Sequence, residues 1–143
     1  MTTRNVSAVS ATIVCAMVSV AWCQANQLED PVDQIQSFRQ ERYDTLRMLT
    51  EVVAQRHAEG TTDIVHLYNA RHQLLQAKVD LVTTHEEKVK THERIVANLA
   101  GKESLITSRH RAGAGAILED TLRAKAERLQ AAIRLLELKA SIQ

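Results

Sequence analysis

The chain has 143 residues, with 18 basic and 17 acidic side chains and only 3% aromatic residues. This length suits one domain. The near balance of charge gives no attraction to nucleic acid or to an anionic membrane surface, so we expect neither as a direct partner.

The first 25 residues differ from the rest of the chain. Arg4 is their only charge, and an apolar run from about Val9 to Trp22 is followed by small residues that end at Ala25. This order is typical of a secretory signal peptide, which predicts export to the periplasm or cell envelope. An uncleaved membrane anchor is the alternative, but the run is shorter than the roughly 20 residues that span a bilayer. Lipid attachment at Cys23 is a minor alternative.

Both cysteines, Cys15 and Cys23, would leave with this segment. The remaining chain would have no disulfide, no thiolate nucleophile and no zinc–sulfur site. It must then fold by burying Leu, Ile, Val and Ala, which favours slender helix pairs over a compact globule.

The first predicted helix runs from Ile35 to about Ala58, after a polar leader at residues 26–34. Pro31 suits a first helical turn. Gly60 is expected to end this helix, because glycine tolerates the positive φ of the position just past a helix end.

The second predicted helix is expected to be capped by Asp63. Its apolar residues recur in alternating steps of 3 and 4, which is typical of a coiled-coil seam. They are Leu67, Ala70, Leu74, Ala77 and Leu81. Thr84 and Glu87 stand in capping-box spacing, so we expect a break near residues 83–86. One long helix is the alternative, and it would put the two glycine turns at opposite ends.

The third predicted helix, His85 to about Arg111, is polar and contains Gly101. We expect it to be the weakest and most mobile helix, kinked near Gly101. The last helix, about residues 117–142, has the most regular stripe, and we expect it to be the strongest. Its stripe is Leu122, Ala126, Leu129, Ile133, Leu136 and Ala140. No stretch reads as a strand. The predicted class is all-α, with coiled-coil-like packing in either an elongated up-down four-helix bundle or two antiparallel hairpins side by side.

One short motif, Arg-His-x-x-Gly, occurs twice, at residues 56–60 and at residues 109–113. After the turns, Leu-Gln-Ala at residues 75–77 recurs at residues 129–131, with one residue added inside the second turn. We interpret residues 35–143 as one domain of two similar repeats, about 35–82 and 85–142. Chance similarity between two amphipathic helices is the alternative.

The turns resemble those of the outer membrane efflux protein (TolC-like) family, in which Arg-aromatic-x-x-Gly precedes Asp-Val-Leu-x-Ala. In this chain, HLYNA (66–70) and DTLRA (120–124) stand where that family has Asp-Val-Leu-x-Ala. His57 and His110 stand where it has the aromatic residue. The resemblance covers about residues 45–140 and omits the barrel strands of that family. It implies a periplasmic helical hairpin module of a transport assembly whose turns contact a protein partner. The tip residues would be Arg56, His57, Gly60, Arg109, His110 and Gly113.

A metal-binding or stress-sensing bundle is the alternative function, with His57, His66 and His110 as candidate ligands if the turns share one end. Exposed surface histidines are the simpler interpretation. The sequence contains no His-Glu-x-x-His, no Gly-x-Ser-x-Gly and no phosphate-binding loop. We therefore expect no enzyme, no cofactor and no small-molecule substrate. The predicted mode of action is contact with a protein partner, or self-association, through the helical seams, with a membrane involved only indirectly.

Overall fold

The structure is a computed structural model that describes residues 30–141. Its helices are α2 (Pro31–Ala58), α3 (Ile64–Leu81), α4 (His85–Arg111) and α5 (Leu118–Ala140). No strand occurs among these residues, so the all-α prediction is confirmed for them. The predicted signal peptide at residues 1–25, with both cysteines, lies outside the described residues. Residues from Ile35 onward form one compact unit, and the account below concerns that unit.

The start of α2 differs from the expectation. Pro31 occupies the first helical turn, as predicted, and the Asp30 carboxylate accepts a hydrogen bond from the backbone N–H of Val32 at 3.0 Å. The helix therefore begins at Pro31 rather than at Ile35. The Asp30 carboxylate caps the first turn, and the fixed φ of proline suits the first helical position.

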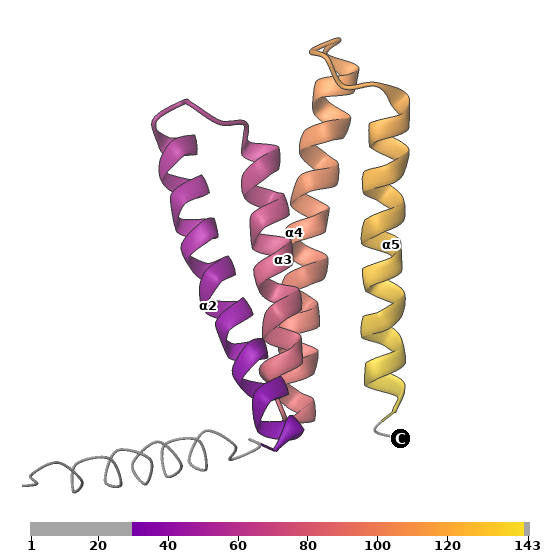
Figure 1. The fold of residues 1–143 in the computed structure, drawn as a ribbon. Helices are drawn as coiled ribbons and strands as arrows, with labels where there is room; N and C mark the ends of the chain where they lie inside the picture. Colours follow the sequence, from indigo (N-terminus) through magenta and orange to yellow (C-terminus); the bar gives the residue numbers. More distant parts are fainter. Residues whose placement is uncertain (1–29, 142–143) are drawn as a thin grey trace, which may run out of the picture. The chain divides into compact units, whose positions relative to one another are not determined.

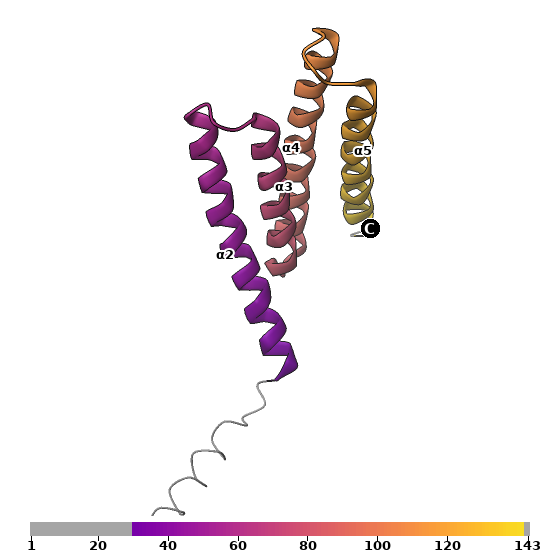
Figure 2. The same ribbon diagram turned by 45° about the horizontal axis from the view of Figure 1, so that its top comes forward.

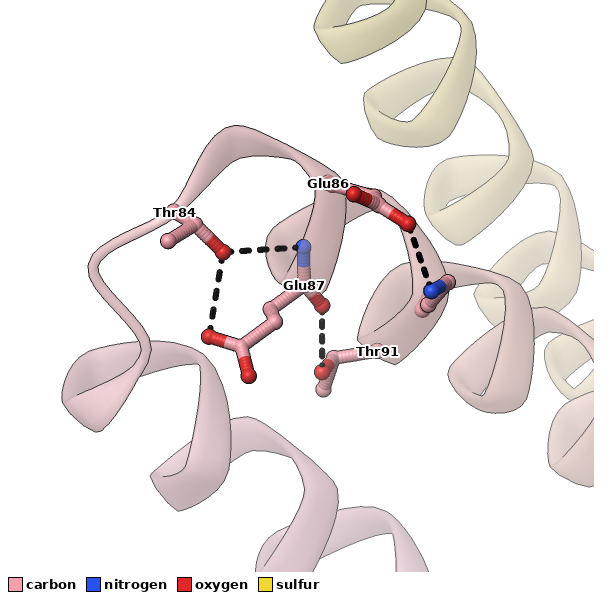
Figure 3. A network of polar contacts seen from close by, with 5 residues as sticks. Thr84, Glu86, Glu87 and Thr91 are labelled. Atoms are coloured by element: carbon pink, nitrogen blue, oxygen red, sulfur yellow. Dashed lines mark hydrogen bonds and ion pairs between the residues drawn. The ribbon is translucent and has the colours of Figure 1, made fainter.

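The predicted break between the second and third helices is confirmed. α3 ends at Leu81, and Thr84 caps α4 by accepting a hydrogen bond from the backbone N–H of Glu87 at 3.3 Å. The Thr84 hydroxyl also donates to the Glu87 carboxylate at 3.0 Å (Figure 3). Glu86 and Glu87 add negative charge in the first turn of α4, where the helix dipole favours it.

The chain reverses direction at each loop from α2 to α5, as Figures 1 and 2 show. The loop around Gly60 and the loop around Gly113 consequently lie at the same end of this unit (Figure 1).

α4 is the central helix of the packed core, since both α3 and α5 pack against it. It contributes the buried side chains of Ile95, Leu99 and Ile106, and buried Thr91 donates its hydroxyl hydrogen to the Glu87 carbonyl. This helix has the weakest apolar pattern in the sequence, yet it supplies the centre of the packed core. Its apolar positions are few, but they lie between two neighbouring helices and are covered from both sides.

The α3 stripe faces the core as expected. Leu67, Ala70 and Ala77 are buried, while Leu74 and Leu81 are half-buried. Gly101 lies inside the uninterrupted helix α4, and a Cβ there would come within 2.9 Å of the Tyr68 ring. The absence of a side chain at Gly101 thus lets the Tyr68 ring approach α4 closely.

The α5 stripe does not face the core. Leu122 is 57% exposed and Leu136 is 66% exposed, and Leu129 and Ile133 are also exposed. Small residues on the opposite side of the helix, Ala124 and Ala131, are buried instead. The regular stripe is therefore not covered by the other described helices.

α2 contributes no buried residue, and the described helices do not pack it against α4 or α5. Its polar link to α3 is the ion pair between Arg42 and Asp80, at 2.8 Å. The helices α3, α4 and α5 thus pack together, whereas α2 has no close packing contact with any of them among the described residues, and the arrangement of the four helices as hairpins stays a prediction.

Ion pairs among the described residues occur both within one helix and between different helices. Three of them link α4 to α5, namely Lys102–Glu127, Glu103–Arg128 and Glu93–Lys139. None of the helices described here combines the length and the apolar character needed to cross a bilayer.

Candidate interaction site at the glycine turns

The first turn ends α2 with a pair of nested backbone hydrogen bonds. The N–H of Gly60 donates to the His57 carbonyl at 3.0 Å, and the N–H of Thr61 donates to the Arg56 carbonyl at 2.9 Å. Gly60 has φ +72°, in the left-handed region where glycine avoids the steric cost of a Cβ. These bonds form a Schellman motif, which satisfies carbonyls that the helix end would leave unpaired.

The second turn repeats this geometry at the end of α4. The N–H of Gly113 donates to the His110 carbonyl at 3.1 Å, and the N–H of Ala114 donates to the Arg109 carbonyl at 2.9 Å. Gly113 has φ +65°. The recurring Arg-His-x-x-Gly motif thus supplies the same two acceptors and the same left-handed residue at both helix ends.

Each histidine of the Arg-His-x-x-Gly motif also holds its own loop. Nδ1 of His57 lies 3.3 Å from the carbonyl oxygen of Thr62, and Nδ1 of His110 lies 3.0 Å from that of Ala116. A carbonyl can only accept, so Nδ1 carries the hydrogen in both rings. The added residue places the second acceptor six positions after its histidine instead of five. Each ring thus supplies a hydrogen-bond donor that closes its turn.

Asp63 joins the two turns. One carboxylate oxygen caps α3 by accepting from the N–H of Val65 at 2.8 Å, and the other lies 2.7 Å from Nη1 of Arg109. The hydrogen bond from Arg109 and the one from Val65 together lower the pKa of the Asp63 carboxyl. The cap was predicted from the sequence, but the ion pair was not, because the two residues are 46 positions apart.

The six predicted tip residues therefore do not have equal surroundings. Gly60 and Gly113 are open, since a Cβ added at either would meet no atom within 4 Å. Arg109 is held by Asp63, whereas Arg56 is exposed and forms no ion pair among residues 30–141. The arginine most available to a partner is Arg56.

The candidate metal ligands are not gathered. His57 and His110 each contact their own loop, and His66 is exposed on the first turn of α3. Within the described part of the chain, no three His, Cys, Asp or Glu side chains are arranged to hold a metal ion.

Two other histidines lie in a surface cavity of about 470 Å³ over α4. Burial lowers the pKa of His72 and of His92, and the nearby guanidinium of Arg134 acts in the same direction on both. No local signal pairs His72 with His92, because they lie on different helices. The cavity also contains the acids Asp80 and Glu127, each already paired with a cation, so its charges do not select an ionic ligand.

A second hollow, of about 440 Å³, lies beside the second turn. Its charged lining consists of Asp63, Lys102, Arg109, Asp120, Arg123 and Glu127. Cations and acids are present in equal number, so the hollow has no net attraction for an ion of either sign.

No protein family, no curated protein and no solved structure matches this chain. The resemblance to the efflux family therefore rests on the turn residues and the segments that follow them.

Proposed function

We propose that this chain is a non-enzymatic interaction module of the cell envelope, which presents its two glycine turns to a protein partner in a transport assembly. The Asp63–Arg109 ion pair is the main support, because it ties the start of α3 to the end of α4 and so keeps both turns at one end. A partner could contact both turns at once, as the resemblance to efflux-protein hairpins implies.

The proposal includes the repeat interpretation. The equal hydrogen bonds at the two turns support an origin by duplication, as does the burial of alanines 54 positions apart. These are Ala70 with Ala124, and Ala77 with Ala131. Glycine-ended helices with these hydrogen bonds are common, so the argument against chance is the Arg-His pair at the same distance before both glycines.

Export is tested by the intact mass of the protein recovered from an envelope fraction of its host. We expect the N-terminus to be Asn26, after cleavage behind Ala25. Recovery of the unprocessed chain from the cytoplasmic fraction would contradict the export part of the proposal.

The partner contact is tested by photocrosslinking in the host cell. A photoreactive amino acid replaces Thr61 in the first turn or Ala114 in the second, and Ala97 on the exposed side of α4 is the control position. We expect both turn positions to give the same crosslinked product, identified by mass spectrometry as a helical component of an envelope transporter, and the control to give none. Equal products from all three positions would refute a role specific to the turns.

A further inference from the structure

Two helices of the described unit carry rows of large apolar side chains that remain exposed. We call these rows the α2 edge and the α5 edge. The α2 edge is formed by Ile35, Phe38, Met48, Leu49 and Val52, and the α5 edge by Leu118, Leu122, Leu129, Ile133 and Leu136. All ten side chains are between 43% and 66% exposed. A soluble monomer rarely leaves apolar patches of this extent in water, so these edges need an occupant.

The α5 edge faces away from the core of its own chain. Ala124 and Ala131 are buried on one side of α5, and the edge occupies the opposite side. The described helices pack neither α3 nor α2 against α5. Within the chain, the edge therefore has no covering helix.

The two edges share the spacing of a coiled-coil seam. Positions 35, 38, 42, 45, 49 and 52 of α2 follow alternating steps of 3 and 4, as do positions 122, 126, 129, 133, 136 and 140 of α5. Two positions of the α2 stripe are polar, namely Arg42, which is paired with Asp80 of α3, and Thr45. Such stripes pack against each other as knobs into holes. Each stripe is long enough to cover the other.

An antiparallel arrangement with Leu49 opposite Leu129 matches the stripes in size. It sets Phe38 opposite Ala140 and Val52 opposite Ala126, so that a large side chain meets a small one. Between these layers, Arg42 lies opposite Leu136 and Thr45 lies opposite Ile133, so the aliphatic parts of two polar side chains of α2 meet branched side chains of α5.

The same register matches the charges beside the stripes. Arg39 comes to lie beside Glu137, and Glu41 beside Lys139. Arg39, Glu41 and Glu137 form no ion pair among the described residues, while Lys139 contacts Glu93 of its own chain. Flanking charges of this kind set partner choice and orientation in coiled coils.

Other pairings are less favourable. A parallel register with Ile35 opposite Ala126 brings Arg39 beside Lys125 and Glu41 beside Glu137. Two α5 edges packed antiparallel about Leu129 and Ile133 bring Lys125 of one copy beside Lys139 of the other, and this repulsion offsets the attraction of Arg123 for Glu137 in the same register. Like charges in such positions oppose association.

We propose that the occupant of each edge is a second copy of this chain, with the α2 edge of each copy packed antiparallel on the α5 edge of the other. The two identical seams close a two-fold dimer, because each copy supplies one edge of each kind. Ten half-exposed side chains offer roughly the 800 Å² that each partner buries in a stable interface, whereas one edge alone offers about half of that area.

The dimer has a defined polarity. α2 and α5 run in opposite directions within one chain (Figure 1), so antiparallel seams leave the two copies parallel. All four glycine turns then lie at the same end of the dimer. This inference goes beyond the proposed function, because the edges are separate from the turns and either idea can fail without the other.

The first test is light scattering after size exclusion, on the full chain carrying Cys15→Ser and Cys23→Ser. We expect twice the mass of the 16.0 kDa chain. Leu129→Glu with Ile133→Glu should give a monomer. Ala97→Glu with Ala100→Glu places the same charges on exposed positions of α4 and should leave the dimer intact. A monomeric parent chain, or a dimer that tolerates the edge variant, would overturn the proposal.

Charge exchange tests the register without inserting charge into the stripe. Arg39→Glu alone and Glu137→Arg alone should each weaken the dimer roughly tenfold, since like charges then face each other. The two substitutions together should restore it. Absence of that rescue would overturn the register, even if an edge variant failed to fold.

Crosslinking distinguishes a second copy from closure within one chain. Chains with Leu49→Cys are mixed with isotope-labelled chains carrying Leu129→Cys, in the same cysteine-free background. We expect a disulfide-linked mixed dimer on oxidation, and no link when Ala97→Cys replaces Leu129→Cys. A link that forms only when both cysteines are on one chain would show that α2 folds onto its own α5, and the proposal would be wrong.

Discussion

The two glycine turns are alike at their entrance, where one helix ends, and different at their exit, where the next helix begins. Both helices end in the same pair of nested hydrogen bonds, with histidine and arginine carbonyls as acceptors. After the first turn, the Asp63 side chain caps α3 and also binds Arg109. After the second turn, the N-cap residue is Ile117, whose side chain accepts no hydrogen bond.

The difference shows which part of a turn can vary. The second loop has an added residue, with Gly115 at φ +82°, and its exit relies on a 3.4 Å hydrogen bond from the N–H of Ile117 to Asp120. Stopping a helix needs the glycine and two carbonyls, and both turns keep them. Starting the next helix is handled by different groups, so the exits should differ most in their sensitivity to substitution.

The largest expected effect is at Asp63. Asp63→Ala removes a helix cap and an interhelical ion pair, and should lower the free energy of unfolding by about 1–2 kcal/mol. Asp120→Ala at the other exit should cost less than about 0.5 kcal/mol, because its hydrogen bond is long. Urea unfolding followed by circular dichroism measures both. Equal losses would show that the two exits do not differ as described.

The entrances should respond alike. Gly60→Ala and Gly113→Ala each place a Cβ at positive φ, where the steric cost outweighs the gain from a stiffer unfolded chain, and each should cost about 1 kcal/mol. The surrounding space is open at both glycines, so no clash adds to this cost. A difference of more than about 0.5 kcal/mol between the two variants would contradict their equivalence, since it exceeds the usual scatter for independent sites.

Acid should weaken the ion pair between Asp63 and Arg109 that joins the two turns. The folded pKa of Asp63 lies below its ordinary value of 3.8, mainly because Arg109 donates a hydrogen bond to the carboxylate. The resulting stabilisation is complete above the unfolded pKa and is lost as the pH falls through the folded pKa. The stability difference between the parent chain and Asp63→Asn should therefore shrink from about pH 5 downward, a window set by these two pKa values. Asparagine still caps the helix, so a constant difference would refute the role of charge.

The smallest expected effect is that of added metal. Nδ1 of His57 and of His110 is engaged with a loop carbonyl, and the described residues contain no group of three candidate ligands. Calorimetry with zinc or copper should show no binding tighter than roughly micromolar, because tight sites use three or four converging ligands. Tight binding of one ion per chain that disappears in His57→Ala or His110→Ala would favour the metal-binding alternative.

Local signals in the sequence predicted the ends of these helices well. Gly60, Asp63 and Thr84 act within a few residues of their own position, so the sequence contains everything that their roles require. The Asp63–Arg109 pair was not predictable in the same way, because it depends on how helices far apart in the sequence come together.

Periodicity predicted which faces are apolar but not what covers them. The stripe of α5 left open whether it packs within the chain or against another molecule, and the buried residues of α5 are alanines on its other side. α4 looked weak because its apolar residues are few, although its position between two helices buries Ile95 and Leu99 well. A stripe in a single sequence does not distinguish a contact within the chain from a contact with another molecule.

The close approach of the Tyr68 ring to Gly101 restricts the register in which α3 packs against α4. The Tyr68 ring occupies the space that a side chain at residue 101 would fill, and the Asn98 amide donates to the Tyr68 carbonyl at 2.9 Å. A shift of α3 by one helical turn would press this ring against a residue that has a side chain, and would break that hydrogen bond. One missing side chain thus selects a single register from several that the alternating apolar pattern alone would allow.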